Sequence, residues 1–426
     1  MFILVSCLSL FVGILFLIQE IQNCRIVVKN VMIYLFILIV LIFACIKFDF
    51  STNRHSSRVG NNWYKFVFVL LVCTAGLRYK VGGDTIIYMM RFDEIPFLDE
   101  IPNYDFLLSG LDPLWIIFSS IFKTINDDFF FFQFFHVLII NSVIFWFIRK
   151  YTVYKFTALL IYFLFFYIYF NMEILRESLA ICIFLLAYPS LEKRNLLRYY
   201  LLAIIAFLFH SSAIILLIFP LLQRVKFNRT NLVIVLVAFV SILVVSIYMP
   251  SILNYVLFTD RLLSKFETYS NVTANLNATI VYSITYLIIP LLFIKLNWRI
   301  NKLDHKFKEL YMLYTLLVLL FLIINGFLRF LNYLAPFMIV YFADLLNSIY
   351  KSYRFKHMKR EVVILLIVIT FIPKTIYYFE DTSRIVNGTH RYNIWFPYSS
   401  IFTKEEYYYR EIIFFERMDE SYDRHN

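Results

Sequence analysis

Long runs of apolar residues that no charge interrupts dominate this chain. The run at 129–148, for example, reads FFFFQFFHVLIINSVIFWFI. A run of about 20 such residues is long enough to cross a bilayer as a helix. Helices are the expected spanning elements, because lipid offers the backbone no hydrogen-bond partners and because barrel strands would alternate apolar and polar residues. The sequence therefore predicts an all-α, polytopic integral membrane protein.

The composition supports this fold class. The 426 residues are 61% hydrophobic and 16% charged, with a mean hydropathy of +0.74. A soluble domain needs more polar residues to meet water. At about 20 residues per span the length allows roughly a dozen crossings, so we expect about 11–13 transmembrane helices. The predicted spans lie near 1–18, 31–47, 63–77, 129–148, 153–170, 172–190, 231–249, 280–297, 310–325, 327–346 and 362–379.

Charged residues between the runs predict the orientation. The net charge of +11 indicates cytoplasmic loops rich in Lys and Arg, and we expect no nucleic-acid partner. Segment 78–112 has seven acidic and three basic residues, and 380–426 has nine and six, so we place both on the outer side. The chain is thus predicted to have a membrane domain over 1–379, with an outer loop at 78–112, and an outer C-terminal tail at 380–426. The basic, cytoplasmic segments are 191–198, 223–230, 295–309 and 350–361.

Two runs do not fit a simple crossing. Residues 113–125 are too short to span, so we expect them to dip in from the outer side without crossing. The run at 199–222 lies between two segments that both look cytoplasmic, which a single crossing cannot satisfy. A re-entrant hairpin, or a pair of short half-helices, resolves the conflict and places His210 at the turn. Such a turn is tolerated at membrane depth where it is buried in protein or lines a wet cavity.

Three arginines occupy positions where the predicted orientation puts the outer half of the membrane. Arg78 follows one predicted span, Arg176 lies one turn inside a second, and Arg329 begins a third. A charge at this depth is costly unless it is compensated, although a lone arginine at the end of a span often reaches the headgroups. Three arginines at one depth, with His210 near, predict a shared anion site. The guanidinium fork suits phosphate, so we expect a lipid-linked pyrophosphate.

The stretch GLRYKVGGDTIIY contains further candidate residues. Lys80 is expected to assist Arg78 in holding the anion, and Gly83 is expected to let the backbone approach closely or bend. Asp84 is a candidate base or sugar-hydroxyl acceptor, and a turn or helix-capping carboxylate is the alternative interpretation. Some outer tyrosines are candidates to stack on sugar rings, and packing or contact with lipid is the alternative. Examples are Tyr79, Tyr88, Tyr333 and Tyr398.

His210 is the second candidate catalytic residue. It interrupts an oily run in FHSSA, and an ordinary imidazole suits general-base work near neutral pH. A buried, hydrogen-bonded histidine that fills a kink is the alternative. Glu173 and Glu177 flank Arg176 and are expected to neutralise it locally.

Read in order, these motifs resemble the EpsG family of Wzy-type polysaccharide polymerases. The family pattern has an Arg before Gly-x-Asp-x-x-x-Tyr, then an Arg before a helix of small residues, then His-x-Ser-Ala. The similarity extends from about residue 70 to 402, through LRFLNYLAP and NIWFPYSSIF. The matching positions are Arg78, Gly83, Asp84, Tyr88, Arg176, Ala180, His210, Ser212 and Ala213.

The resemblance implies a GT-C-like glycosyltransferase that is a multi-pass protein of the bacterial inner membrane. Such an enzyme joins undecaprenyl-pyrophosphate-linked oligosaccharide repeat units into O-antigen, capsule or exopolysaccharide on the outer face. The expected partners are that lipid-linked oligosaccharide and the bilayer, with a chain-length regulator and a flippase as further candidates. Arginine electrostatics are expected to stabilise the leaving group without a cofactor or a bound metal.

Three other functions remain open at this stage, and one of them is a catalytically silent assembly scaffold. A metal-dependent GT-C transferase or a ligase would use the acidic pairs Asp93-Glu94 and Asp99-Glu100 to hold a divalent cation. A polysaccharide flippase or transporter would carry internal repeats with helices broken in matching halves. We find no such repeat in the sequence.

Overall fold

The structure is a computed structural model that describes residues 25–51, 57–106, 109–222, 283–288, 305–321, 328–351 and 398–404, together with positions 291, 292, 295, 395, 410, 411, 414 and 415. Within these ranges every regular element is a helix, which confirms the all-α class. The predicted spans 1–18, 231–249 and 362–379 lie outside the described residues. The same is true of half of 280–297 and of most of the tail 380–426.

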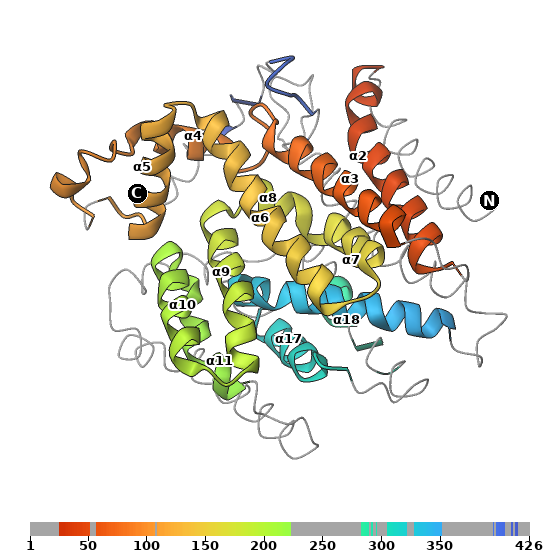
Figure 1. The fold of residues 1–426 in the computed structure, drawn as a ribbon. Helices are drawn as coiled ribbons and strands as arrows, with labels where there is room; N and C mark the ends of the chain where they lie inside the picture. The colour runs from red at the N-terminus through yellow and green to blue at the C-terminus, as the bar shows by residue number, and fades with distance from the viewer. Residues whose placement is uncertain are drawn as a thin grey trace.

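The apolar runs in the described ranges form helices close to their predicted bounds (Figure 1). Among the residues that the structure describes, three helices are long and apolar enough to cross a bilayer, namely Phe129–Tyr151, Lys155–Met172 and Leu328–Ser348. The chain is therefore an α-helical membrane protein, and its total number of spans stays a prediction. The larger elements are α2 (Arg25–Ala44), α3 (Ser57–Gly76), α4 (Thr85–Glu94), α5 (Pro113–Ile125), α6 (Phe129–Tyr151), α9 (Leu175–Glu192), α10 (Leu196–Phe209), α17 (Lys308–Phe321) and α18 (Leu328–Lys351).

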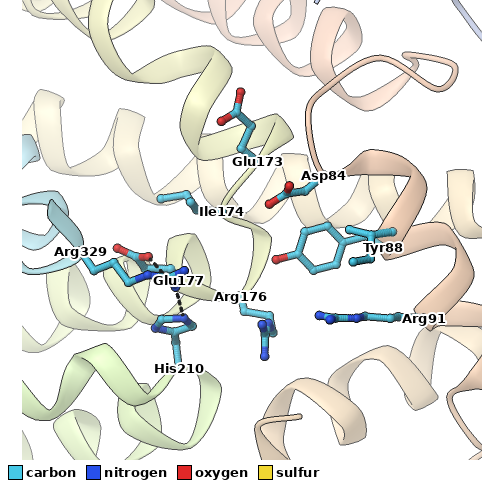
Figure 2. A pocket seen from close by; sticks show the side chains of 10 residues that line it. Asp84, Tyr88, Arg91, Glu173, Ile174, Arg176, Glu177, His210 and Arg329 are labelled. Carbon is cyan, nitrogen blue, oxygen red and sulfur yellow. Dashed lines mark hydrogen bonds and ion pairs between the residues drawn. The ribbon is translucent and has the colours of Figure 1, made fainter. Parts of the chain in front are cut away.

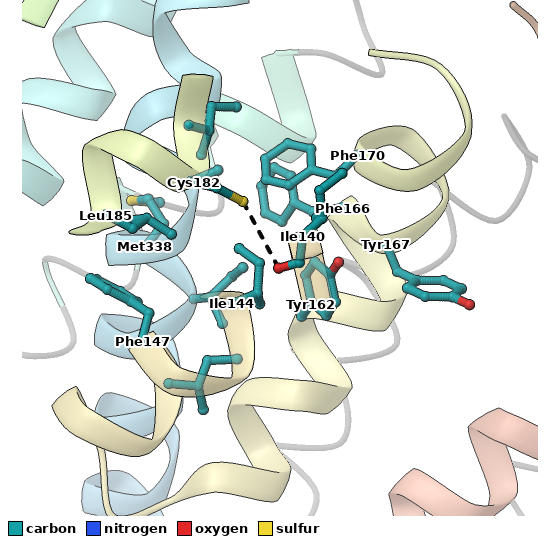
Figure 3. Packing of buried hydrophobic residues seen from close by; sticks show 14 of the residues in the cluster. Ile140, Ile144, Phe147, Tyr162, Phe166, Tyr167, Phe170, Cys182, Leu185 and Met338 are labelled. Atoms are coloured by element: carbon teal, nitrogen blue, oxygen red, sulfur yellow. Dashed lines mark hydrogen bonds between the residues drawn. The ribbon is translucent and has the colours of Figure 1, made fainter. Parts of the chain in front are cut away.

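Aromatic packing joins the helices at the centre of the molecule. Phe147 on α6 lies 5.1 Å from Phe337 on α18, measured between ring centroids. Phe337 in turn lies 4.7 Å from Tyr188 on α9. Figure 3 shows the neighbouring layer, where side chains of α6, α9 and α18 meet those of the 155–172 segment. The high aromatic content of the sequence thus holds α6, α9 and α18 against one another.

A ring of three polar side chains lies inside this apolar core. The Asn141 amide donates to Asn171 Oδ1 at 2.7 Å, and the Asn171 amide donates to the Tyr162 hydroxyl at 2.9 Å. That hydroxyl donates back to Asn141 Oδ1 at 3.2 Å. Because buried amides are costly without partners, the closed ring fixes how α6 meets the 155–172 segment.

The pair of predicted spans at 153–170 and 172–190 is separated by a sharp break. The first consists of α7 (Lys155–Tyr162), a π-helical turn η3 (Phe163–Tyr167) and α8 (Ile168–Met172). Glu173 and Ile174 leave helical geometry, and α9 begins at Leu175. π-helical turns and helix breaks are frequent near functional sites, because they release backbone and re-aim side chains.

The run at 199–222 also folds as two helical arms. After α10, His210 is extended, and the chain continues through η4 (Ser211–Ile214) into α11 (Ile215–Leu222). The Tyr199 hydroxyl near the start of α10 donates to the Leu216 carbonyl of α11 at 2.8 Å, which joins the two arms. His210 thus lies at the turn, as the hairpin interpretation requires. The side of the membrane that each end meets stays a prediction.

The segment 78–112 contains more regular structure than the term loop suggests. It includes the ten-residue helix α4 and a short turn η2 (Ile101–Asn103), and it leads directly into α5. Lys123 of α5 donates to the carbonyls of Phe92 and Asp93 at 3.1 and 2.7 Å, so α5 is tied to the end of α4. The two helices form one unit at the upper left of Figure 1.

Candidate active site

A polar cavity lies where four separate parts of the chain meet (Figure 2). Its volume is about 200 Å³. At roughly 30 Å³ for each water molecule, this is space for about six waters or for a group the size of a diphosphate. The lining residues are Asp84, Ile87, Tyr88, Arg91, Glu173, Ile174, Arg176, Glu177, His210 and Arg329.

One face of α4 forms the first wall of the cavity. Asp84 precedes the helix, and Ile87, Tyr88 and Arg91 follow at helical spacing, so all four side chains reach the same space. The Tyr88 ring packs on Trp115 of α5, with 5.6 Å between ring centroids. Arg91 was not among the predicted site residues. Its signal in the sequence is the i, i+3/i+4, i+7 pattern that begins at Asp84.

Asp84 presents its carboxylate to the cavity. It stands at the N-cap position of α4, but its side chain makes no capping hydrogen bond. The helix-capping alternative therefore does not describe this residue. Part of the side chain is accessible from the cavity, while protein atoms crowd the rest and raise the pKa of Asp84 above its ordinary value. The positive charges of the three cavity arginines, with Arg329 first, oppose this rise.

Arg176, on the first turn of α9, forms the second wall. Its guanidinium Nη1 lies 2.9 Å from Oδ2 of Asp112, the residue that precedes α5. The hydrogen-bonded partner of Arg176 thus comes from a distant segment, while Glu177 attracts Arg176 by charge alone. Asp112 left no signal in the sequence that distinguished it from other loop acids.

Arg329, at the start of α18, is in contact with two acceptors. Its Nη1 lies 2.8 Å from Nε2 of His210 and 3.6 Å from Oε2 of Glu177. The Glu177 side chain is only 1% exposed, and the Asn332 amide donates to its Oε1 at 2.7 Å. The Arg329 side chain remains 37% exposed. The Arg329 guanidinium is thus held by the buried His210 and Glu177 and is still accessible from the cavity.

Arg78 does not line the cavity. Its side chain is fully buried, and its guanidinium donates to the carbonyls of Ala75 at 2.5 Å and Val81 at 2.9 Å. These bonds close the turn that follows α3. The predicted pyrophosphate contact is therefore not present, because the side chain folds back onto its own backbone instead of reaching outward.

Lys80 and its neighbours hold a distant part of the chain. The Lys80 ammonium forms an ion pair with Glu411. The backbone carbonyl of Lys80 accepts a hydrogen bond from Arg410 Nη1 at 2.8 Å. Two backbone bonds join the same turn to residues 399–401, from Tyr79 N to Ser399 O at 2.8 Å and from Ile401 N to Leu77 O at 2.9 Å. We call these contacts between 77–81 and 399–411 the C-terminal clasp. Lys80 thus lies outside the cavity, in contrast to the prediction.

The two adjacent glycines have different roles. Gly82 has a φ of 121°, and a Cβ there would lie 2.6 Å from Thr85 Oγ1 and 2.9 Å from the Met172 carbonyl oxygen. Gly82 therefore lets the α3–α4 turn touch the end of α8. A Cβ on Gly83 would meet Glu173 at 3.7 Å, an ordinary contact at the edge of the cavity.

Two of the predicted tyrosines are placed differently. Tyr88 lines the cavity, as predicted for a substrate-binding residue. Tyr333 is 1% exposed, and its hydroxyl lies 3.0 Å from Ser212 Oγ behind His210. Its ring cannot stack on a sugar from that position, so this prediction is corrected.

The comparison with protein families agrees with the motif series. The family model described as the EpsG family matches residues 61–400. The chain belongs to the EpsG family. No curated protein and no solved structure matches it. The match includes α4, α9, the α10–α11 turn and α18, which are the four parts that supply the cavity of this EpsG protein.

The cavity of this member of the EpsG family combines two chemical capacities. Three guanidinium groups, from Arg91, Arg176 and Arg329, supply donors for an anion with several oxygen atoms. Asp84 supplies a carboxylate that has no hydrogen bond or ion pair with the described residues, so it is available to accept a proton. Within the described ranges no group of three metal-ligating side chains gathers.

Proposed function

We propose that this EpsG protein is a polysaccharide polymerase of the bacterial inner membrane. It transfers a growing glycan from undecaprenyl pyrophosphate to the non-reducing end of the next lipid-linked repeat unit, on the outer face. The observation that supports this proposal most is the meeting of Arg91, Arg176 and Arg329 with Asp84 in one cavity. Membership of the EpsG family, over residues 61–400, supports it independently.

The transfer requires two charge movements that the cavity is suited to assist. The hydroxyl oxygen of the acceptor sugar bonds to the anomeric carbon of the donor, and the bond from that carbon to the pyrophosphate oxygen breaks. The electron pair leaves with the pyrophosphate, whose added negative charge the arginines stabilise. The hydroxyl proton passes to the Asp84 carboxylate. The balance of atoms and charge needs no further reactant.

The arrangement of charges favours an anionic leaving group over a neutral ligand. Arg176 and Arg329 are each held by a carboxylate, from Asp112 and Glu177, so they stay in place before substrate arrives. Preorganised donors stabilise developing charge without first having to reorient. Arg91 has no hydrogen bond or ion pair among the described residues, so its charge is available to the substrate.

The decisive experiment supplies purified protein with an undecaprenyl-pyrophosphate-linked repeat unit and separates the products on a gel. A ladder of glycans from the wild-type protein, and none from Arg91→Ala or Asp84→Asn protein of equal amount, is the expected result. Movement of the lipid-linked unit across reconstituted vesicles without a ladder would instead indicate a transporter. Loss of the ladder on chelation would indicate a metal-dependent transferase.

A further inference from the structure

The hydrogen bonds of His210 restrict what this residue can do. Its Nε2 lies 2.8 Å from Nη1 of Arg329, and its Nδ1 lies 2.6 Å from the Ser212 hydroxyl. The Ser212 hydroxyl in turn lies 3.0 Å from the Tyr333 hydroxyl. The His210 side chain is buried, although the cavity reaches it. Both ring nitrogens therefore have close partners.

The partner of Nε2 determines the tautomer. A guanidinium group carries donors only and stays protonated, so Nε2 has to accept the hydrogen bond with its lone pair. The proton of the neutral ring then lies on Nδ1, which donates to the Ser212 hydroxyl, and that hydroxyl is free to donate to Tyr333. The opposite tautomer would direct an N–H group at a cation.

One contact favours the opposite tautomer and is weaker. The backbone N–H of Ser212 also approaches Nδ1, at 3.2 Å. A neutral contact of that length is outweighed by a charge-assisted bond of 2.8 Å, which is roughly twice as strong as a neutral one. The shorter Nδ1 to hydroxyl distance agrees with donation from the ring.

We infer that His210 is a positioning residue that accepts a hydrogen bond from Arg329 and directs its guanidinium into the cavity, so that Asp84 alone receives the acceptor proton. This inference rests on the proposed function. A second proton on His210 would fall on Nε2, against the guanidinium, so the ring is unsuited to act as a base. Glu177 stabilises Arg329 by charge at 3.6 Å, whereas His210 supplies the direct bond that orients it.

Substitution of His210 distinguishes a residue that accepts a hydrogen bond from one that takes up a proton as a base. Glutamine at position 210 places an amide oxygen near the site of Nε2, where it can accept from Arg329 but cannot take up a proton at neutral pH. We expect His210→Gln to keep polymerisation within about tenfold of wild type and His210→Ala to lose about 100-fold. Equal loss in the two variants, with both proteins folded, would overturn the inference.

Nitrogen-15 NMR of histidine-labelled wild-type protein tests the same contact without an activity assay. The His210 signals are assigned by their absence from the His210→Gln spectrum. A neutral ring with an unprotonated Nε2 is the expected result, and a ring protonated at Nε2 near neutral pH would contradict it. If this tautomer is found but the wild-type protein makes no ladder, the positioning contact stands and the proposed polymerase function fails.

Discussion

Two regions of this protein contain arginines that were predicted to bind the same anion, and the regions differ in what surrounds the positive charge. At the turn after α3, Arg78 is sealed from solvent, and its Nε and Nη1 donate to backbone carbonyls. At the cavity, Arg176 and Arg329 meet carboxylates and keep an open side. The comparison shows that an arginine near a motif does not by itself mark a binding site. The type of acceptor around the guanidinium group and the open volume beside it distinguish a binding role from a structural one.

The largest effect on polymerisation is expected from substitution of a cavity arginine. Arg176→Ala should lower the polymerisation rate by about 100-fold or more, because a preorganised charge next to the leaving group is lost. The measurement is the glycan ladder from equal amounts of protein. Since the substitution removes the ion pair between Arg176 and Asp112, the same change is also made in an Asp112→Asn background. A normal ladder from that double variant would remove Arg176 from the site.

Substitution of the buried Arg78 should affect the stability of the protein more than it affects the polymerisation rate directly. Arg78→Ala removes two hydrogen bonds from a charged donor and should lower the free energy of unfolding by about 3 kcal/mol. The melting temperature of the purified protein in detergent reports the change. Arg91→Ala is the matched control, because that side chain has no such bonds, and its melting temperature should stay near that of wild type. If Arg78→Ala melted normally yet made no polymer, Arg78 would be a substrate contact after all.

Gly82 and Gly83 lie in the turn between the two regions, and substitution should affect them differently. Gly82→Ala should lower the free energy of unfolding by about 2 kcal/mol and displace Asp84, because the new Cβ meets backbone and requires an unfavourable φ. Gly83→Ala should change it by less than about 0.5 kcal/mol, since its Cβ would make an ordinary contact. Melting temperatures and ladders of both variants provide the measurement. Equal behaviour of the pair would show that the turn does not contact Met172.

The smallest effect is expected at the exposed edge of the C-terminal clasp. Glu411→Gln removes the partner of Lys80 and should cost less than about 1 kcal/mol, because both side chains are partly solvated. Polymerisation should stay near wild type. A loss comparable to that of Arg176→Ala would mean that the clasp, and not the cavity alone, controls the chemistry.

The sequence predicted the helices well, because continuous apolar runs have few other solutions in a lipid solvent. It also predicted that Asp84, Arg176, His210 and Arg329 would meet, since each is a polar residue at an oily boundary. The role of Arg78 could not be predicted in this way, because the direction of a long side chain depends on which acceptors the folded backbone exposes. The sequence could not predict the bond between Arg176 and Asp112 either, since the two residues lie in separate parts of the chain.

Arg91 was missed for a different reason. The segment 78–112 was interpreted as an outer loop from its charge, and a loop has no face on which residues at spacing three or four meet. Once α4 is recognised as a helix, Asp84, Tyr88 and Arg91 fall on one side of it. Tyr333 shows the converse limit, because an aromatic residue near a predicted site is more often packed behind it than open to it.

The clasp also has a consequence for biosynthesis. Residues 77–81 leave the ribosome more than three hundred positions before the partners at 399–411 that they contact. Contacts of such long range close last, because the intervening chain has to be ordered first. The α3–α4 turn next to Asp84 therefore gains these contacts only after residues 399–411 have been synthesised, when the helices from α4 to α18 have already been made.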